Sequence, residues 1–300
     1  MGRSSEIVMA MLLLMAMVKL ILVEGNGGLQ DCSFNQRKCK SGFDKASGLG
    51  HFILVHGAGH GEWNWFRLKP ILEAAGYKVT TVQLGTTLTT SLNSTENITF
   101  LKYSKPLFDV MKCIDHHKVM LVGHSFGGVS ISLATEKFPK KVSVAVYLTA
   151  LMPDTAHKLS YVVREFSKVP RDWKDSCSFT SRDNSSWFSF GDKFLKSSLY
   201  QLCSLEDFAL ISTLKRPGSS FSNDLDKIQL SEEKYGSVDR VFIVAKDDLA
   251  ITEDFQREMI ANYSVKEVKV IHHSGHMPML SRPMVLSAHL LEIARNYSSA

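Results

Sequence analysis

The chain has 300 residues, of which 44% are hydrophobic and 22% are charged, values typical of a folded protein and unlike those of disordered or fibrous chains. This length suits one α/β domain that carries an insertion. The formal net charge is +5, but the Lys and Arg residues are scattered and form no basic stripe, which excludes nucleic acid as an expected partner.

Residues 1–25 predict a signal peptide. Arg3 precedes an apolar run over Ile7–Val23 that only Lys19 interrupts, and small residues follow. A retained membrane anchor is the alternative, because a span needs about 17–25 residues. Lys19 favours cleavage, after which no membrane contact is expected. Five Asn-x-Ser/Thr sequons agree with a secreted or vacuolar glycoprotein: Asn93, Asn97, Asn184, Asn262 and Asn296.

Residues 26–50 read as an N-terminal extension that contains two of the five cysteines, Cys32 and Cys39, which are candidates for a disulfide. Cys113, Cys177 and Cys203 are expected as buried thiols, with a bridge between the last two left open. Five cysteines are too few for a disulfide scaffold, and their spacing matches no zinc site. We therefore expect no metal and no cofactor.

From residue 51 onward, short β-branched runs alternate with longer amphipathic stretches, which predicts an α/β fold with helices on both faces of a mostly parallel sheet. The expected strands are His51–Val55, Lys78–Val82, Lys118–Val122, Val142–Leu148, Arg240–Ala245 and Glu267–Ile271. The expected helices are Trp65–Ala75, Phe100–His116, Phe126–Phe138, Glu253–Asn262 and Pro283–Tyr297.

The alternation of strand-like and helix-like patterns stops between Met152 and Phe221. This segment offers no strand of adequate length, but it is rich in aromatic residues, which favours a folded cap over a disordered loop. A cap over residues 152–221 divides the core into residues 51–151 and 222–300. It would cover the carboxyl edge of the sheet, where open α/β sheets bind ligands.

The strongest motif is Gly123-His124-Ser125-Phe126-Gly127, placed between an expected strand and an expected helix. A serine on such a tight turn projects its hydroxyl above the sheet, and the amide of the next residue, Phe126, points into the site. This placement predicts Ser125 as a nucleophile and the Phe126 N–H as an oxyanion donor, since a purely structural glycine turn needs no serine at its apex.

A second oxyanion donor is expected in the glycine-rich loop His56–Gly61, where small residues let the backbone N–H of Ala58 approach a reacting carbonyl. A phosphate-binding loop is the alternative, but no Lys-Ser/Thr pair follows.

An acid and then a histidine should follow the nucleophile. Asp247 and Asp248 follow the strand Arg240–Ala245, and His276 lies beyond the last strand. His272 and His273 compete for the role of base but are expected to point away from the cleft. His56 and His124 flank glycine turns and are expected to bond the loop backbone.

These residues resemble the plant methylesterase family of α/β-hydrolases, which also contains hydroxynitrile lyases and an alkaloid-aldehyde esterase. The resemblance runs from His51 to Tyr297. Its most specific segments are His51–Ala58, Leu68–Pro70, Leu72–Gly76, Val122–Ser125, Met152–Asp154, Tyr200–Ser204 and Phe255–Arg257.

The resemblance implies a catalytic triad of Ser125, Asp248 and His276, with oxyanion amides at Ala58 and Phe126. It favours Asp248 over Asp247 because the family's acid stands just before an Xaa-Ala-Ile stretch, here Leu249–Ile251. Family members typically hydrolyse methyl esters of small plant acids such as salicylate, jasmonate and indole acetate, without a cofactor. The implied partner is therefore a small-molecule ester.

Two other activities are left open. In the lyase branch of the family, a Thr precedes the residue that corresponds to Ala58 and a Lys follows the catalytic histidine, whereas this chain has Gly57 and Met277. A hydrolase-like sensor that binds a small molecule with little turnover is the other alternative. The run Gln83–Leu88 replaces the family's usual Asp-Leu-Ala-Ala-Ser-Gly, so substrate preference can differ. A homodimer is also left open.

Overall fold

The computed structural model describes residues 48–85, 98–115, 117–170, 172–180 and 186–297. The predicted signal peptide, nearly all of the 26–50 extension, the candidate pair Cys32 and Cys39, and the sequons at Asn93, Asn97 and Asn184 lie outside these residues. None of the helices in the described part of the chain combines the length and apolar character needed to cross a membrane.

The core is a six-stranded sheet with the order β2-β1-β3-β4-β8-β9, in which every neighbouring pair is parallel. Its inner strands are buried on both faces and are almost wholly apolar, the composition that a parallel sheet between two helical layers requires. The strands are β1 His51–Val55, β2 Lys78–Val82, β3 Val119–Ser125, β4 Val142–Ala150, β8 Arg240–Ala245 and β9 Glu267–Ile271.

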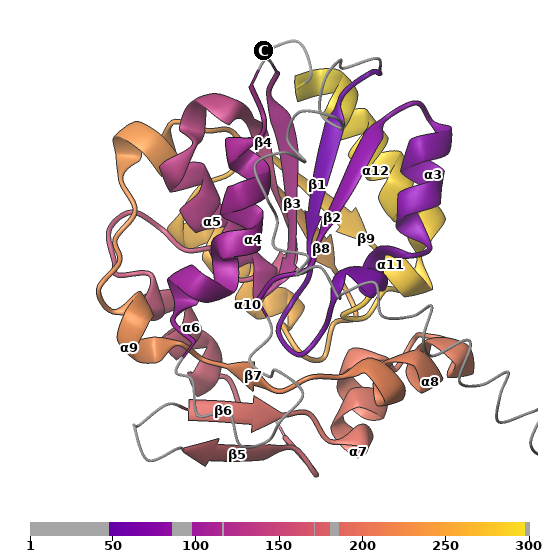
Figure 1. The fold of residues 1–300 in the computed structure, drawn as a ribbon. Coiled ribbons are helices and arrows are strands. Elements are labelled where there is room, and N and C mark those ends of the chain that lie inside the picture. The colour runs from indigo at the N-terminus through magenta and orange to yellow at the C-terminus, as the bar shows by residue number, and fades with distance from the viewer. Residues whose placement is uncertain (1–47, 86–97, 116, 171, 181–185, 298–300) are drawn as a thin grey trace, which may run out of the picture. The chain divides into compact units, whose positions relative to one another are not determined.

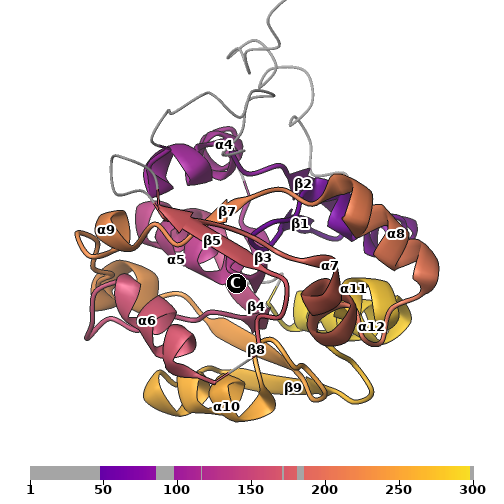
Figure 2. The ribbon, with the colours of Figure 1, turned by 90° about the horizontal axis from the view of Figure 1, so that it is seen from below.

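Helices cover both faces of this sheet (Figures 1 and 2). On one face, α5 packs against β1, β3 and β4, with α4 beside it and α10 against β8; on the other, α3 and α12 pack together against the edge strands. The helices of the core are α3 Leu68–Ala74, α4 Phe100–Lys112, α5 Gly127–Lys137, α10 Glu253–Asn262, α11 Pro278–Ser281 and α12 Pro283–Tyr297, with single 3-10 turns η2 Glu62–Trp65 and η3 Pro139–Lys141.

The elements between β4 and β8 form the layer at the carboxyl ends of the strands (Figure 1), except residues 232–236, which pack against α5. They include a small antiparallel sheet of β5 Cys177–Thr180, β6 Ser186–Ser189 and β7 Gly218–Ser219. The helices of this segment are α6 Ser160–Lys168, α7 Asp192–Phe194, α8 Leu205–Leu214 and α9 Ser222–Leu225, with π-helical turns η4 Leu195–Leu199 and η5 Glu232–Gly236.

Polar contacts join this layer to the core. The guanidinium of Arg67 donates two hydrogen bonds, of 3.1 and 2.9 Å, to one carboxylate oxygen of Asp207, which is buried at the start of α8. The backbone N–H of Arg216 donates to the carbonyl of Gly59, 3.0 Å away. The Gly59 residue (φ +73°) also leaves space for Phe190, since a Cβ there would lie 2.9 Å from that ring.

The predicted fold class is confirmed, and four of the six expected strands have the predicted bounds. The strand expected over Lys118–Val122 begins one residue later and continues to Ser125, because Gly123 and His124 stay paired with β4. The helix expected over Trp65–Ala75 begins only at Leu68, after the separate 3-10 turn.

The cap was expected to offer no strand of adequate length, but three short strands, β5–β7, form a sheet there. The expectation of a thiol was wrong for Cys113, which takes part in a disulfide. Cys177 and Cys203 are free, so the bridge left open between them does not form, and the expectation of burial was wrong for Cys177, which is exposed.

Candidate active site

Ser125 is the last residue of β3 and has φ +54°, the left-handed conformation that L side chains rarely adopt. The turn into α5 closes only because its flanking residues lack side chains. A Cβ on Gly123 would lie 2.9 Å from the carbonyl oxygen of Gly127, and a Cβ on Gly127 would lie 2.6 Å from that of His56. The turn therefore matches the strained strand-to-helix geometry that presents a serine hydroxyl above a sheet.

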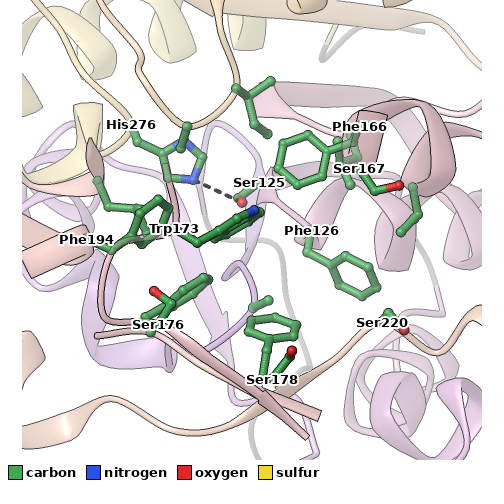
Figure 3. A pocket seen from close by; sticks show the side chains of 18 of the residues that line it. Ser125, Phe126, Phe166, Ser167, Trp173, Ser176, Ser178, Phe194, Ser220 and His276 are labelled. Atoms are coloured by element: carbon green, nitrogen blue, oxygen red, sulfur yellow. Dashed lines mark hydrogen bonds between the residues drawn. The ribbon is translucent and has the colours of Figure 1, made fainter. Parts of the chain in front are cut away.

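The structure brings Ser125, His276 and Asp248 together in one hydrogen-bonded row. Figure 3 shows the contact between Ser125 and His276. Nε2 of His276 lies 3.0 Å from Oγ of Ser125, and Nδ1 of His276 lies 2.7 Å from Oδ2 of Asp248. Because a carboxylate oxygen accepts, Nδ1 carries the proton and Nε2 is left to accept from the serine hydroxyl. His276 follows β9 and Asp248 follows β8, so the three groups meet at the carboxyl edge of the sheet.

The Asp248 carboxylate is buried and fully bonded. Its Oδ1 accepts from the backbone N–H groups of Ala250 and Ile251, at 2.7 and 2.9 Å. Its Oδ2 accepts from His276 and from the hydroxyl of Thr149, at 2.7 and 2.5 Å. Four donors match the four acceptor positions of a carboxylate. The neighbouring Asp247, by contrast, is exposed.

The loop after β1 holds the peptide that carries the Ala58 N–H. The backbone N–H of Leu84 donates to Nε2 of His56, 3.1 Å away, so the proton of this neutral ring is on Nδ1, which donates to the carbonyl of Gly57 at 2.8 Å. Burial lowers the pKa of His56 to about 4. Since the Gly57 carbonyl and the Ala58 N–H belong to one planar peptide, this bond fixes the direction of the N–H.

Ala58 and Phe126 both line the cavity that contains Ser125, as the expected oxyanion positions require. His60, which the sequence analysis did not single out, supports the same loop: its Nδ1 donates to the carbonyl of Ala58 at 2.7 Å, and the hydroxyl of Tyr200 in the cap lies 3.0 Å from its Nε2. Burial lowers the pKa of His60 to about 3, so the ring is neutral.

The other histidines lie as expected. Nε2 of His124 donates to the backbone carbonyl of His276, 2.7 Å away, and so ties the loop of His276 to β3. Burial lowers the pKa of His124 well below its usual value, which keeps a positive charge away from His276, whose ring centroid is 4.7 Å distant. His272 and His273 are exposed at the end of β9.

A cavity of about 360 Å³ opens above Ser125 and His276. Its walls are mostly aromatic and aliphatic, and the rings of Phe126, Phe166, Trp173 and Phe194 surround the Ser125 hydroxyl in Figure 3. Serine hydroxyls and the thiol-bearing Cys177 are also present. Among the described residues that line it, none is Lys, Arg, Asp or Glu. The cavity therefore suits an uncharged, apolar group.

Comparison with known proteins agrees with this arrangement. The sequence profile described as "Alpha/beta hydrolase family" matches residues 52–289. Methylesterase 2 of Arabidopsis thaliana is 46% identical over 254 residues, which cover 82% of this chain and 97% of that protein. Salicylic acid-binding protein 2 of Nicotiana tabacum is 46% identical over 256 residues, covering 83% and 98% respectively.

The crystal structure of polyneuridine aldehyde esterase is similar as well, with a TM-score of 0.76 and 41% sequence identity, covering 82% of this chain and 99% of that one. Profile, sequence and structure thus agree over most of the chain. The chain therefore belongs to the alpha/beta hydrolase family.

Proposed function

We propose that the protein is a serine carboxylesterase that hydrolyses small, apolar esters, methyl esters among them. The observation that carries the proposal is the row Asp248–His276–Ser125, with bonds of 2.7 and 3.0 Å, at the base of an apolar cavity. Similarity to proteins named methylesterases over more than four-fifths of the chain supports the same activity.

The proposed reaction is a two-step acyl transfer. His276 takes the proton of Ser125 through Nε2 while the serine oxygen attacks the ester carbonyl. The N–H groups of Ala58 and Phe126 hold the oxyanion, and Asp248 keeps the imidazole in the required tautomer. The leaving alcohol receives its proton from His276. Water, activated by the same ring, then releases the acid and restores the serine.

The cavity supports a particular choice of acyl group. Its volume of about 360 Å³ falls in the range of sites for drug-sized ligands, about 300–1,000 Å³, so it has room for more than a single ring. Its described walls bear no Lys or Arg that could pair with an anion. We therefore expect esters of neutral apolar acids to be preferred over esters whose acyl part carries a second carboxylate.

This preference can be tested with a matched pair of substrates, methyl hexanoate and monomethyl adipate, which differ in a terminal methyl or carboxylate. Burial of an unpaired carboxylate costs several kcal/mol, so we expect kcat/KM to be at least about 100-fold lower for the adipate. Comparable values for the two esters would contradict the expected preference while leaving the esterase proposal intact.

The esterase proposal itself is tested by multiple turnovers of such esters and by their loss in Ser125→Ala. A sensor would release product far more slowly than it binds ligand, so repeated turnover separates the two functions. Ester cleavage that survives in Ser125→Ala would refute the mechanism.

The lyase alternative has less support. Met277 follows the histidine and is a fully buried, uncharged side chain whose sulfur lies 3.8 Å from Nδ2 of Asn64, where the lyase branch would have a cation. Gly57 has no hydroxyl, and a Cβ there would lie only 2.7 Å from Cβ of Ser125. Assay of cyanide release from a hydroxynitrile is expected to show no turnover above background.

We also propose that the protein passes through the secretory pathway. Both sequon residues in the described part of the chain, Asn262 and Asn296, have exposed side chains, as glycosylation requires. Expression in eukaryotic cells should give a protein that becomes smaller on treatment with an N-glycosidase and whose N-terminus, by mass spectrometry, begins near residue 26. An intact N-terminus with no attached sugar would contradict this proposal.

A further inference from the structure

Thr149 occupies an unusual backbone position in β4. In the pairing of β3 with β4, His124 faces Leu148 and Ser125 faces Ala150, so Thr149 is the extra residue of a β-bulge. Its φ is +35°, a conformation that a β-branched residue rarely adopts because its side chain crowds the backbone. Such strain persists only where the surrounding structure holds it in place, and it often marks a functional site.

The bulge turns the Thr149 side chain toward the row of polar groups described above. The residue is completely buried, and its hydroxyl donates to Oδ2 of Asp248 at 2.5 Å. The same oxygen accepts from Nδ1 of His276 at 2.7 Å. Next to the bulge, the N–H of Leu151 donates to the carbonyl of Ser125, 3.0 Å away. The bulged part of β4 therefore contacts both Asp248 and Ser125, the two end residues of the row.

We propose that Thr149 is a positioning residue, whose hydroxyl fixes the orientation of the Asp248 carboxylate and limits how strongly that carboxylate attracts the proton of His276. The inference rests on the proposed esterase function. The backbone N–H groups of Ala250 and Ile251 hold only Oδ1, so without Thr149 the sole restraint on Oδ2 would be the imidazole that it must orient.

The hydroxyl also has an electrostatic consequence. Two donors share the lone pairs of Oδ2, so the oxygen is a weaker acceptor toward the imidazole than it would be alone. A weaker acceptor stabilises the protonated ring less, so removal of the Thr149 hydroxyl should strengthen the bond between Oδ2 and the imidazole. The other titratable groups near this ring are His124 from β3 and His60 from the loop after β1, both kept neutral by burial.

The test compares Thr149→Val, which removes the hydroxyl and keeps the shape, with Thr149→Ser, which keeps the hydroxyl. Thr135→Val serves as a matched control, because Thr135 is equally buried but donates to the carbonyl of Ile131 within α5. For each variant, kcat/KM for methyl hexanoate is measured between pH 5 and 9. The proton resonance of His276 Nδ1–H is recorded by NMR and assigned by its loss in His276→Asn.

In Thr149→Val we expect the acid limb of the kcat/KM profile to move upward by about 0.5–1 pH unit. Plateau kcat should fall roughly three- to tenfold, the effect of losing part of one hydrogen bond to a charged group, with KM within about twofold of wild type. The Nδ1 proton resonance should move downfield. Thr149→Ser and Thr135→Val should both keep the wild-type profile and resonance.

A pH profile and a resonance of Thr149→Val that coincide with those of wild type would overturn the inference. It would equally be overturned if Thr149→Ser showed the changes of Thr149→Val, because the effect would then come from the backbone and not from the hydroxyl. The NMR measurement needs no turnover, so it decides the role of Thr149 even if the esterase proposal fails through Ser125→Ala.

Discussion

Replacement of Asp248 by asparagine should abolish most activity by inverting the tautomer of His276. In the wild-type site, Oδ1 accepts from two backbone N–H groups, those of Ala250 and Ile251, which cannot turn away. The amide oxygen of the asparagine must therefore take the place of Oδ1. Its NH₂ group then faces Nδ1 of His276 and the hydroxyl of Thr149, where Oδ2 accepted both bonds.

The magnitudes decide between the two orientations of the amide. A flipped amide would set its NH₂ group against both backbone donors and leave two buried groups unbonded, at about 1–3 kcal/mol each. The unflipped amide instead donates to Nδ1, and the imidazole proton moves to Nε2, which points at Ser125 from 3.0 Å. A protonated Nε2 cannot accept the serine proton, and we expect kcat to fall by about 10⁴-fold with KM little changed.

The assay is methanol release from methyl hexanoate at pH 8, with circular dichroism to verify folding. Asp247→Asn is the matched control, because Asp247 is the adjacent residue and its side chain is exposed. We expect that variant to stay within about twofold of wild type, as surface substitutions usually do. Asp248→Asn activity within about tenfold of wild type, in a folded protein, would refute the reasoning about the tautomer.

Three further predictions follow from the geometry. Gly57→Ala should lower kcat by about 10- to 100-fold, because the new Cβ would lie 2.7 Å from Cβ of Ser125 and would displace the serine. Unchanged kinetics would contradict this prediction and show that the loop moves to accommodate the methyl group. The neutral, buried His56 and His60, with pKa values of about 4 and 3, contribute stability that is complete above about pH 6.5 and is lost as the pH falls. The free energy of unfolding in urea should accordingly drop by about 2 kcal/mol per pH unit between pH 6 and 4, and a flat profile would contradict the burial of these two rings. A thiol reagent at pH 8 should label exposed Cys177 and block the cavity that it lines, while Cys203, whose pKa burial raises to about 12, should stay unlabelled on mass spectrometry.

The central sheet could be predicted from the sequence because its signal is local. The segments His51–Val55 and Arg240–Ala245 are short apolar runs bounded by polar residues, and the structure places strands over those same residues. The cap sheet had no such signal. Its strands have four or two residues, and β6 finds its partner in Gly218–Ser219, far along the chain, so the pairing depends on contacts that no local pattern records.

In the candidate site, too, some residues could be predicted from the sequence and others could not. Ser125 and His276 could be singled out because each follows a recognisable strand and they occur in a known order, while the family resemblance separated Asp248 from Asp247. The structure brings the three residues within hydrogen-bond distance. Their catalytic roles remain a prediction. Thr149 could not be found, because its side chain reaches Asp248 only through a bulge in the register between β3 and β4. His60 was missed because its partner Tyr200 belongs to the cap.

The separation of 151 residues between Ser125 and His276 has a consequence for biosynthesis. When the serine leaves the ribosome, neither its base nor its acid has been translated, so the nascent polypeptide carries an inert hydroxyl. The chemistry is assembled only when the segment with β8 and β9 docks at the edge of the sheet. Hydrolytic competence is thereby delayed until the chain is almost fully synthesised, and ester turnover in a cell extract reports on completed folding.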